Sequence, residues 1–181
     1  MRTVILIILS FILTTTVCYA EDSELQAKAF HQMYASLCAK NINNLSVLKE
    51  KIKDLPSFPP EQASKFLGGN SGSAWPVPDK AGLFVLSLPD NKNQCAILAR
   101  RASAVKVEEQ FLNFVASAPA PLLTRKISDS YAKTASNGET HTIAYEWYVE
   151  NAKRKFVFTL TTSKYENAEI QALGSIAIVS E

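Results

Sequence analysis

The chain has 181 residues, of which 47% are hydrophobic and 20% are charged, and its formal net charge at pH 7 is +2. This composition is typical of a globular protein and excludes a disordered chain or one with several membrane spans. The near-neutral charge argues against a nucleic-acid-binding protein, because such proteins need a surplus of basic side chains that releases counterions.

The first twenty residues differ from the rest and predict a cleaved secretory signal. Arg2 gives a positive start, Val4 to Leu13 is almost entirely apolar, and Cys18-Tyr19-Ala20 places small residues at the cleavage-recognition positions. The apolar run is too short to span a bilayer comfortably, which favours cleavage over an anchor. Lipidation at Cys18 is the rival interpretation, but Val17 stands where Gly, Ala or Ser usually precedes a lipidated cysteine. We therefore expect a periplasmic or extracellular protein without stable membrane insertion.

The mature chain, residues 21–181, has the size of one domain, and it keeps two cysteines, Cys38 and Cys95. In an oxidising compartment these two most simply form a disulfide bond. Two buried free thiols are an alternative. A nucleophilic cysteine is a second alternative, although Cys95 lies in an apolar run without an activating group nearby in the sequence.

The N-terminal part of the mature chain predicts helices. Ser23-Glu24-Leu25-Gln26 has the pattern of a capping box, and the apolar residues that follow recur at helical spacing and turn Cys38 inward. A second helix is expected after Asn43-Asn44. A short third helix is expected between Pro59-Pro60 and Gly68-Gly69.

An irregular loop is expected from Gly68 to Lys80, where Gly, Ser, Asn and Pro surround a single aromatic residue, Trp75. Loops of this length often carry function, so Asn70, Ser71 and Trp75 are candidate binding residues. Residues 69–73 superficially resemble the nucleophile loop of trypsin-like proteases. That chemistry needs a histidine base held by a carboxylate, and the only upstream histidine, His31, lies on a predicted helix.

The second half of the chain predicts an antiparallel sheet with a helix at about 104–116. The expected strands are Gly82–Leu88, Cys95–Ala99, about 122–133, 140–150 and Lys155–Thr162. Asn137-Gly138 is a strong two-residue hairpin signal between the third and fourth of these strands. The segment from Asn167 to Val179 fits a helix or a strand, and we favour the helix. The fold class is therefore α+β, with about five antiparallel strands, N-terminal helices and further helices packed against the sheet.

His141 is the main candidate for chemistry. It shares one face of a predicted strand with Ile143, Tyr145 and Trp147. Its simplest interpretation is a histidine near a strand end that is hydrogen-bonded to a neighbour. A general base near Tyr145 or Glu139 is the functional alternative. Neither histidine has zinc-like spacing to other ligands, so we expect no metal and no cofactor.

Glu146 and Glu150 share a strand face about 13 Å apart, which exceeds the usual separation of a glycosidase carboxylate pair. We expect these two carboxylates to face solvent.

Basic residues and aromatic residues form the remaining candidate surfaces. Lys153-Arg154-Lys155 forms a hairpin tip, and with Arg100-Arg101 and Arg125-Lys126 it suggests a patch for phosphate groups or an acidic partner. Solvated turns and charged strand edges account for these residues equally well. Tyr145, Trp147 and Tyr148 fit either a binding groove or the core.

Several stretches together resemble a family of small exported proteins of Gram-negative bacteria, some with lipoprotein signals and none with an assigned activity. The stretches are Phe66-Leu-Gly-Gly69, Gly72-Ser-Ala-Trp-Pro-Val-Pro78, Ala118-Pro-Ala-Pro-Leu122, Asn137-Gly-Glu-Thr-His-Thr142, Ala144-Tyr-Glu-Trp147, Phe158-Thr-Leu-Thr-Thr162 and Gln171-Ala-Leu-Gly174. The resemblance covers about residues 30–180 and implies export and a Gram-negative source. It implies no catalytic residues.

The leading functional hypothesis is an exported, non-enzymatic binding protein whose partner is another protein of the envelope, or a host factor after type II secretion. The candidate contact residues are Asn70, Ser71, Trp75, His141, Lys153 and Arg154. One alternative is a periplasmic inhibitor or immunity protein with residues 68–80 as its protruding loop. The other is an unrecognised hydrolase that uses His141.

Overall fold

The computed structural model describes the backbone of residues 14–180 and the side chains of residues 21–180. Most of the predicted signal segment, 1–20, lies outside the described residues, and so does the side chain of Cys18. Helix α2 (Thr14–Met33) is the first described element. Within residues 14–180, no helix combines the length and apolar character needed to cross a membrane.

Helices form in the N-terminal region and at about 104–116, where the sequence predicts them, but the first helix does not open at the Ser23–Gln26 capping box, because these residues lie inside helix α2 (Thr14–Met33). Helix α2 runs directly into the π-helical turn η1 (Tyr34–Ala39), and it is followed by α3 (Leu45–Ile52), α4 (Pro60–Ala63), η2 (Ser64–Phe66) and α5 (Ala104–Ala116). Pro60 occupies the first turn of α4, where its missing N–H costs nothing. The Ser103 side chain caps α5 by accepting a hydrogen bond from the Lys106 N–H.

The strands form one seven-stranded antiparallel sheet, which confirms the α+β class. The strands are β1 (Gly72–Asp79), β2 (Gly82–Pro89), β3 (Gln94–Ala99), β4 (Leu123–Thr134), β5 (Gly138–Tyr148), β6 (Arg154–Ser163) and β7 (Ala172–Ser180). Their order in the sheet is β1-β2-β3-β7-β6-β5-β4. Five of them correspond to the expected strands, and β1 and β7 are additional.

The expectation of an irregular loop at 68–80 is wrong, because most of it is strand β1. Trp75 pairs with Leu86 of β2, and its side chain is only 8% exposed. Pairing with the apolar β2 overrides the loop-like composition. Pro76 and Pro78 are tolerated because β1 is an edge strand, where a missing N–H breaks no ladder.

The favoured C-terminal helix is also wrong, since Ala172–Ser180 is strand β7 between β3 and β6. Gly174 on this strand lies against the rings of Phe30 and Tyr34, where a Cβ atom would come within 2.9 Å of Phe30. The strand therefore provides the flat central position on which the N-terminal helix packs.

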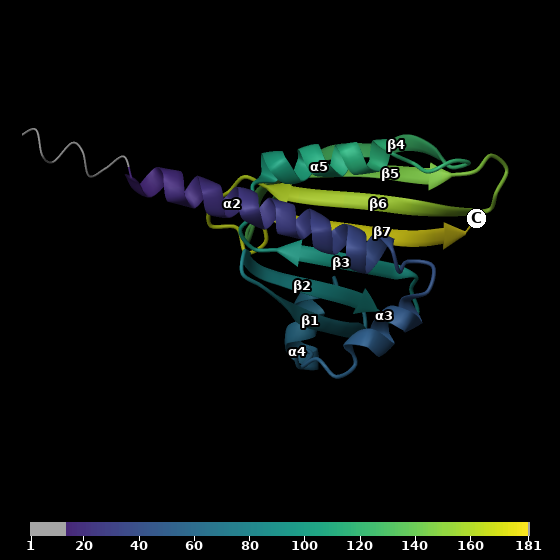
Figure 1. Ribbon diagram of the computed structural model, residues 1–181, viewed down its shortest axis with the longest axis horizontal. Coiled ribbons are helices and arrows are strands. Elements are labelled where there is room, and N and C mark those ends of the chain that lie inside the picture. Colours follow the sequence, from purple (N-terminus) through teal and green to yellow (C-terminus); the bar gives the residue numbers. More distant parts are fainter. Residues whose placement is uncertain (1–13, 181) are drawn as a thin grey trace, which may run out of the picture.

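Two helices cover one face of the sheet, and the core lies beneath them (Figure 1). Helix α2 with η1 packs over β3 and β7, and α5 packs over β5 and β6. A smaller apolar cluster around Leu67 and Ala74 joins α4 and η2 to the opposite face of β1 and β2. The β4–β7 half of the sheet thus carries α5 on the face that holds His141.

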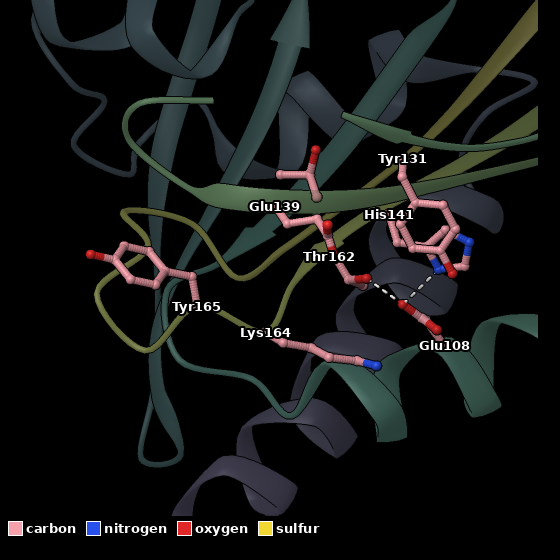
Figure 2. Close-up of a pocket in the computed structure, with 8 residues that line it drawn as sticks. Glu108, Tyr131, Glu139, His141, Thr162, Lys164 and Tyr165 are labelled. Atoms are coloured by element: carbon pink, nitrogen blue, oxygen red, sulfur yellow. Dashed lines mark hydrogen bonds and ion pairs between the residues drawn. The ribbon is translucent and has the colours of Figure 1, made fainter. Parts of the chain in front are cut away.

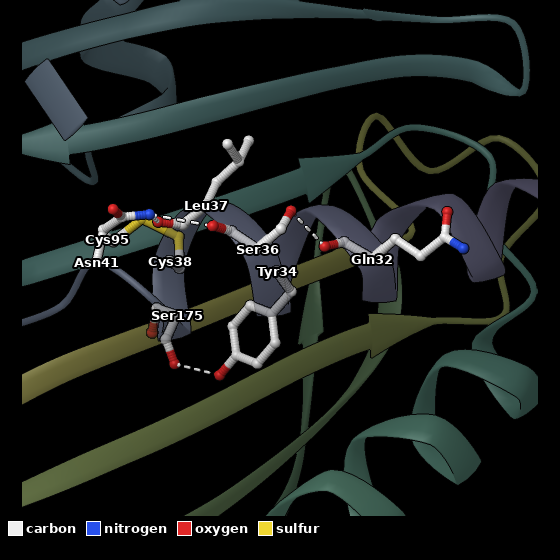
Figure 3. The surroundings of a disulfide bond; sticks show 8 residues. All are labelled: Gln32, Tyr34, Ser36, Leu37, Cys38, Asn41, Cys95 and Ser175. Atoms are coloured by element: carbon white, nitrogen blue, oxygen red, sulfur yellow. Dashed lines mark hydrogen bonds between the residues drawn. A yellow bond between two sulfur atoms is a disulfide. The ribbon is translucent and has the colours of Figure 1, made fainter. Parts of the chain in front are cut away.

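The predicted disulfide is confirmed, and it joins η1 to the centre of the sheet (Figure 3). Cys38 and Cys95 have their Cα atoms 5.3 Å apart and are both fully buried. Beside them, the Tyr34 hydroxyl donates a hydrogen bond of 2.9 Å to the Ser175 carbonyl of β7. The burial of Tyr34 raises its pKa well above the usual range, so it remains a neutral donor.

Candidate functional site

A cavity of about 280 Å³ lies where the β4–β5 hairpin meets α5 and the segment that follows β6 (Figure 2). Its lining is mostly polar or aromatic, and four elements contribute to it. The lining residues are Glu108, Tyr131, Glu139, Thr140, His141, Thr162, Lys164 and Tyr165.

Sheet register brings the central residues of this cavity together. His141 on β5 has Tyr131 of β4 and Thr162 of β6 as its cross-strand partners. Residues directly opposite one another in antiparallel strands place their side chains on the same face. That face is the one covered by α5, whose second turn supplies Glu108.

The His141 side chain lies between two carboxylates. Its Nδ1 is 3.1 Å from Glu108 Oε1, and its Nε2 is 2.9 Å from Asp129 Oδ1. The ring stacks on Tyr131, with the ring centres 4.3 Å apart and the planes within 6° of parallel. Only the doubly protonated imidazolium donates to both carboxylates at once, so the geometry matches a positively charged histidine.

The electrostatics of the site agree with this geometry. Partial burial acts to lower the pKa of His141, but the hydrogen bonds to Asp129 and Glu108 and their negative charges outweigh it, so the pKa is raised. The pKa of Asp129 is lowered, first by its hydrogen bond from Lys126 and then by that from His141. Mildly acidic conditions therefore leave His141 charged while Asp129 stays ionised.

A hydrogen-bonded chain fixes these groups in place. Glu108 Oε1 also accepts a hydrogen bond from the Thr162 hydroxyl, as the dashed lines in Figure 2 show. The chain Asp129–His141–Glu108–Thr162 consequently links β4, β5, α5 and β6. Because both ring nitrogens of His141 are engaged, neither is free to accept a proton from a reacting group.

The two residues considered as partners of His141 in general-base chemistry lie in different places. Glu139 lines the same cavity and is exposed. Tyr145 packs edge-on against Phe111 of α5 in the core, with the ring centres 6.3 Å apart. Among residues 21–180, no three His, Cys, Asp or Glu side chains are grouped so that they could hold a metal ion.

The other predicted contact residues do not join this cavity. Trp75 is in the main core. Asn70 is held by the Leu67 carbonyl and by Lys92, whose ammonium is 2.6 Å from Asn70 Oδ1. Ser71 is exposed just before β1. Four strands separate β1 from β5, a distance of about 24 Å at the usual strand spacing.

Lys153 and Arg154 lie at the β5–β6 connection and the start of β6. Arg154 donates a hydrogen bond of 3.4 Å to Asn43 Oδ1, and Lys153 lines a shallow polar cavity near Glu146. The six predicted contact residues therefore occupy separate regions, and of these six only His141 lines the cavity between the β4–β5 hairpin and α5.

The expectation that Glu146 faces solvent is wrong, because its side chain is only 3% exposed. It forms ion pairs with Arg125 from β4 and with Lys155 from β6, the latter at 3.4 Å. Two of the predicted basic clusters thus meet at one buried carboxylate. Arg125 and Lys155 approach this carboxylate from the two strands that flank β5.

Sequence reasoning missed three residues that surround His141: Glu108, Asp129 and Tyr131. The predicted β4–β5 hairpin could have located Asp129 and Tyr131 beside His141. A turn made of Asn137 and Gly138 alone, however, gives the wrong pairing of residues across the two strands. The actual turn covers 135–137, with Thr134 opposite Gly138 and Gly138 at a φ of +64°. This three-residue form places Tyr131, rather than Thr134, opposite His141.

In comparisons with known proteins, no family model matches the chain, and no curated protein matches it significantly.

Proposed function

We propose that the protein is an exported, non-enzymatic binding protein that accepts a polar group of a partner protein in the cavity beside His141. The observation that carries this proposal is the preorganised lining of the cavity. His141, Glu108 and Thr162 are held in place by a chain of hydrogen bonds, so a ligand would meet a fixed wall beside the exposed charged side chains of Glu139 and Lys164. Fixed polar groups reduce the ordering cost of binding.

Binding fits the cavity better than hydrolysis does. A general base needs a free acceptor nitrogen within hydrogen-bond reach of the proton that it removes. In His141 both nitrogens already face carboxylates. The hydrolase alternative would require one of these two contacts to break before each reaction.

The size and rim of the cavity favour a protein partner. A volume of about 280 Å³ is slightly below the usual range for sites that enclose a small molecule. It suits a single inserted side chain. Tyr131 and Tyr165 at the rim are 69% and 48% exposed, and exposed tyrosines of this kind are enriched in protein interfaces.

Export is supported by the disulfide and by the N-terminal sequence. A buried Cys38–Cys95 bond is expected in an oxidising compartment, and residues 1–20 have the pattern of a secretory signal. We therefore place the partner in the bacterial envelope, or in a host if the protein is secreted further.

The observed fold gives less support to the inhibitor alternative than the sequence did. It relied on a protruding loop at 68–80, and residues 72–79 are instead paired with β2.

Quantitative affinity capture from envelope extract tests the proposal. Glu139→Lys reverses an exposed charge in the cavity, and Glu61→Lys makes the same change on the exposed surface of α4. We expect the first variant to lose a captured protein that the unmodified chain and the second variant retain. Identical captured sets for all three proteins would refute a binding role for this cavity.

A further inference from the structure

Strand β4 presents a long open edge. It is the last strand in the sheet order, and all twelve of its residues are exposed. Its inner edge pairs with β5, and within residues 14–180 no strand pairs with its outer edge. Twelve residues give an edge of about 40 Å with unpaired N–H and C=O groups, which is a template for another strand.

The opposite edge of the sheet is closed by contrast. On β1, Pro76 and Pro78 lack the N–H groups that a further strand would need. The Phe58 N–H also donates a hydrogen bond of 2.8 Å to the Ala74 carbonyl, so part of that edge is already occupied. The two edges of one sheet are therefore built differently, and only β1 carries these blocking features.

Two of the three basic side chains of β4, Arg125 and Lys126, are held in ion pairs, and the third, Lys133, lies near the hairpin end of the strand. Lysine and arginine often protect edge strands because their charges repel a second strand. Here Lys126 pairs with Asp129 at 2.8 Å, and Arg125 pairs with the buried Glu146. The exposed Leu123, Ile127 and Tyr131 remain along the strand as apolar and aromatic surface.

We propose that two copies of this chain associate through antiparallel pairing of their β4 strands, which joins the two sheets edge to edge. The occupant of the edge is a second copy because β4 is complementary to itself about one two-fold axis. That axis passes through Ser128, just after the β-bulge at Ile127.

The register follows from the bulge. Ile127 is the extra residue between Lys126 and Ser128, so the alternation of faces shifts there by one position. With Ser128 opposite Ser128 of the second copy, side chains on the same face oppose one another along both halves of the strand. The resulting pairs are Lys126 with Asp129, Arg125 with Ser130, Thr124 with Tyr131 and Leu123 with Ala132.

Charge selects this register over its neighbours. On each side of the axis it sets the Lys126–Asp129 ion pair of one strand beside the same pair of the other, with Lys126 facing Asp129, so that the four charges alternate in sign, which is stabilising on facing strands. Registers centred on Lys126 or Asp129 place like charges directly opposite each other and are disfavoured. The contact is a single strand pair, so we expect weak association with a dissociation constant of roughly 10–1,000 μM.

Cysteine cross-linking tests both the pairing and its register. Under mild oxidation with the native disulfide intact, Ser128→Cys is expected to form a covalent dimer in high yield. Leu123→Cys and Ala132→Cys are each expected to stay monomeric alone but to form a dimer when mixed. Ser71→Cys, an exposed position beside the opposite edge, is the control for random collisions.

The proposal is overturned if Ser128→Cys dimerises no faster than Ser71→Cys. It is also overturned if the unmodified chain sediments as a monomer at concentrations up to about 1 mM, ten-fold or more above the expected midrange of association. These outcomes are independent of ligand capture at the His141 cavity, because they need no partner protein.

Discussion

At the residue scale, His141 connects helix α5 to strand β4 at the end of the sheet near the β4–β5 turn. Its imidazolium bridges Glu108 on α5 and Asp129 on β4. When His141 loses its proton, one ring nitrogen becomes an acceptor, and one carboxylate loses its donor. The attachment of β4 to α5 at this end of the sheet therefore depends on pH.

This dependence has a definite sign. Because the pKa of His141 is raised in the folded protein, its contribution to the free energy of unfolding is fully present below the unfolded pKa of about 6.5 and lost as pH rises through the folded value. We predict that His141→Asn lowers the free energy of unfolding more at about pH 5.5 than at about pH 8.5, as measured by urea denaturation.

His31 supplies an internal control with the opposite sign. Its burial lowers its pKa, so its contribution is present above the unfolded pKa and lost as pH falls. His31→Asn is therefore expected to cost more at the higher pH. Equal costs of His141→Asn at both pH values would contradict a charged histidine between two carboxylates.

At this scale the sequence predicts the face of His141 but not its neighbours. Alternation along 140–150 correctly groups His141 with Ile143, Tyr145 and Trp147. Glu108 lies 33 residues away from His141, on a helix. A single sequence does not indicate which strand residue a given helix residue will contact. The burial of Glu146 was missed for the same reason, because its partners come from two other strands.

At the element scale, the β4–β5 turn controls the shape of the cavity. Gly138 has a φ of +64°, and a Cβ atom added there would lie 3.0 Å from Cβ and Cγ of Tyr165, which lines the cavity. Glycine is required at this position both for its backbone conformation and for the close approach of that ring.

We predict that Gly138→Ala destabilises the fold by more than Gly69→Ala does. Gly69 also has a positive φ, of +79°, but has no atom within 4 Å of the added Cβ. Gly69→Ala should therefore report the backbone cost alone, about 1 kcal/mol. Urea denaturation of both variants isolates the steric contribution at Tyr165, and equal losses of stability would contradict this close contact.

Elements were predictable where their local pattern agrees with the tertiary structure. The apolar β2 and β3, the alternating β5 and the stripe of α5 were all anticipated. The β1 strand was not, because Pro76 and Pro78 suggest a loop unless the strand is known to lie at an edge. The β7 strand was missed because its apolar spacing also fits a helix until the open position between β3 and β6 is known.

At the scale of the whole molecule, the disulfide ties the N-terminal helical segment to β3, the strand next to the centre of the sheet. The linked cysteines are 57 residues apart in the sequence, and closing a loop of that length restricts the unfolded chain considerably. We predict that Cys38→Ala/Cys95→Ala lowers the free energy of unfolding by about 4 kcal/mol. Urea denaturation of the oxidised protein and of the double variant measures this loss, and a difference below about 1 kcal/mol would contradict a structural role.

The central claim is that the cavity beside His141 contacts a partner, and site-specific photo-cross-linking in cells tests it most directly. A benzophenone side chain would replace Tyr165 at the cavity rim or Val47 on α3, two positions of similar exposure at 48% and 42%. The account predicts that the probe at 165 cross-links to a distinct protein, identifiable by mass spectrometry, and that the probe at 47 does not. The absence of any adduct at 165, or the same adduct at both positions, would contradict it.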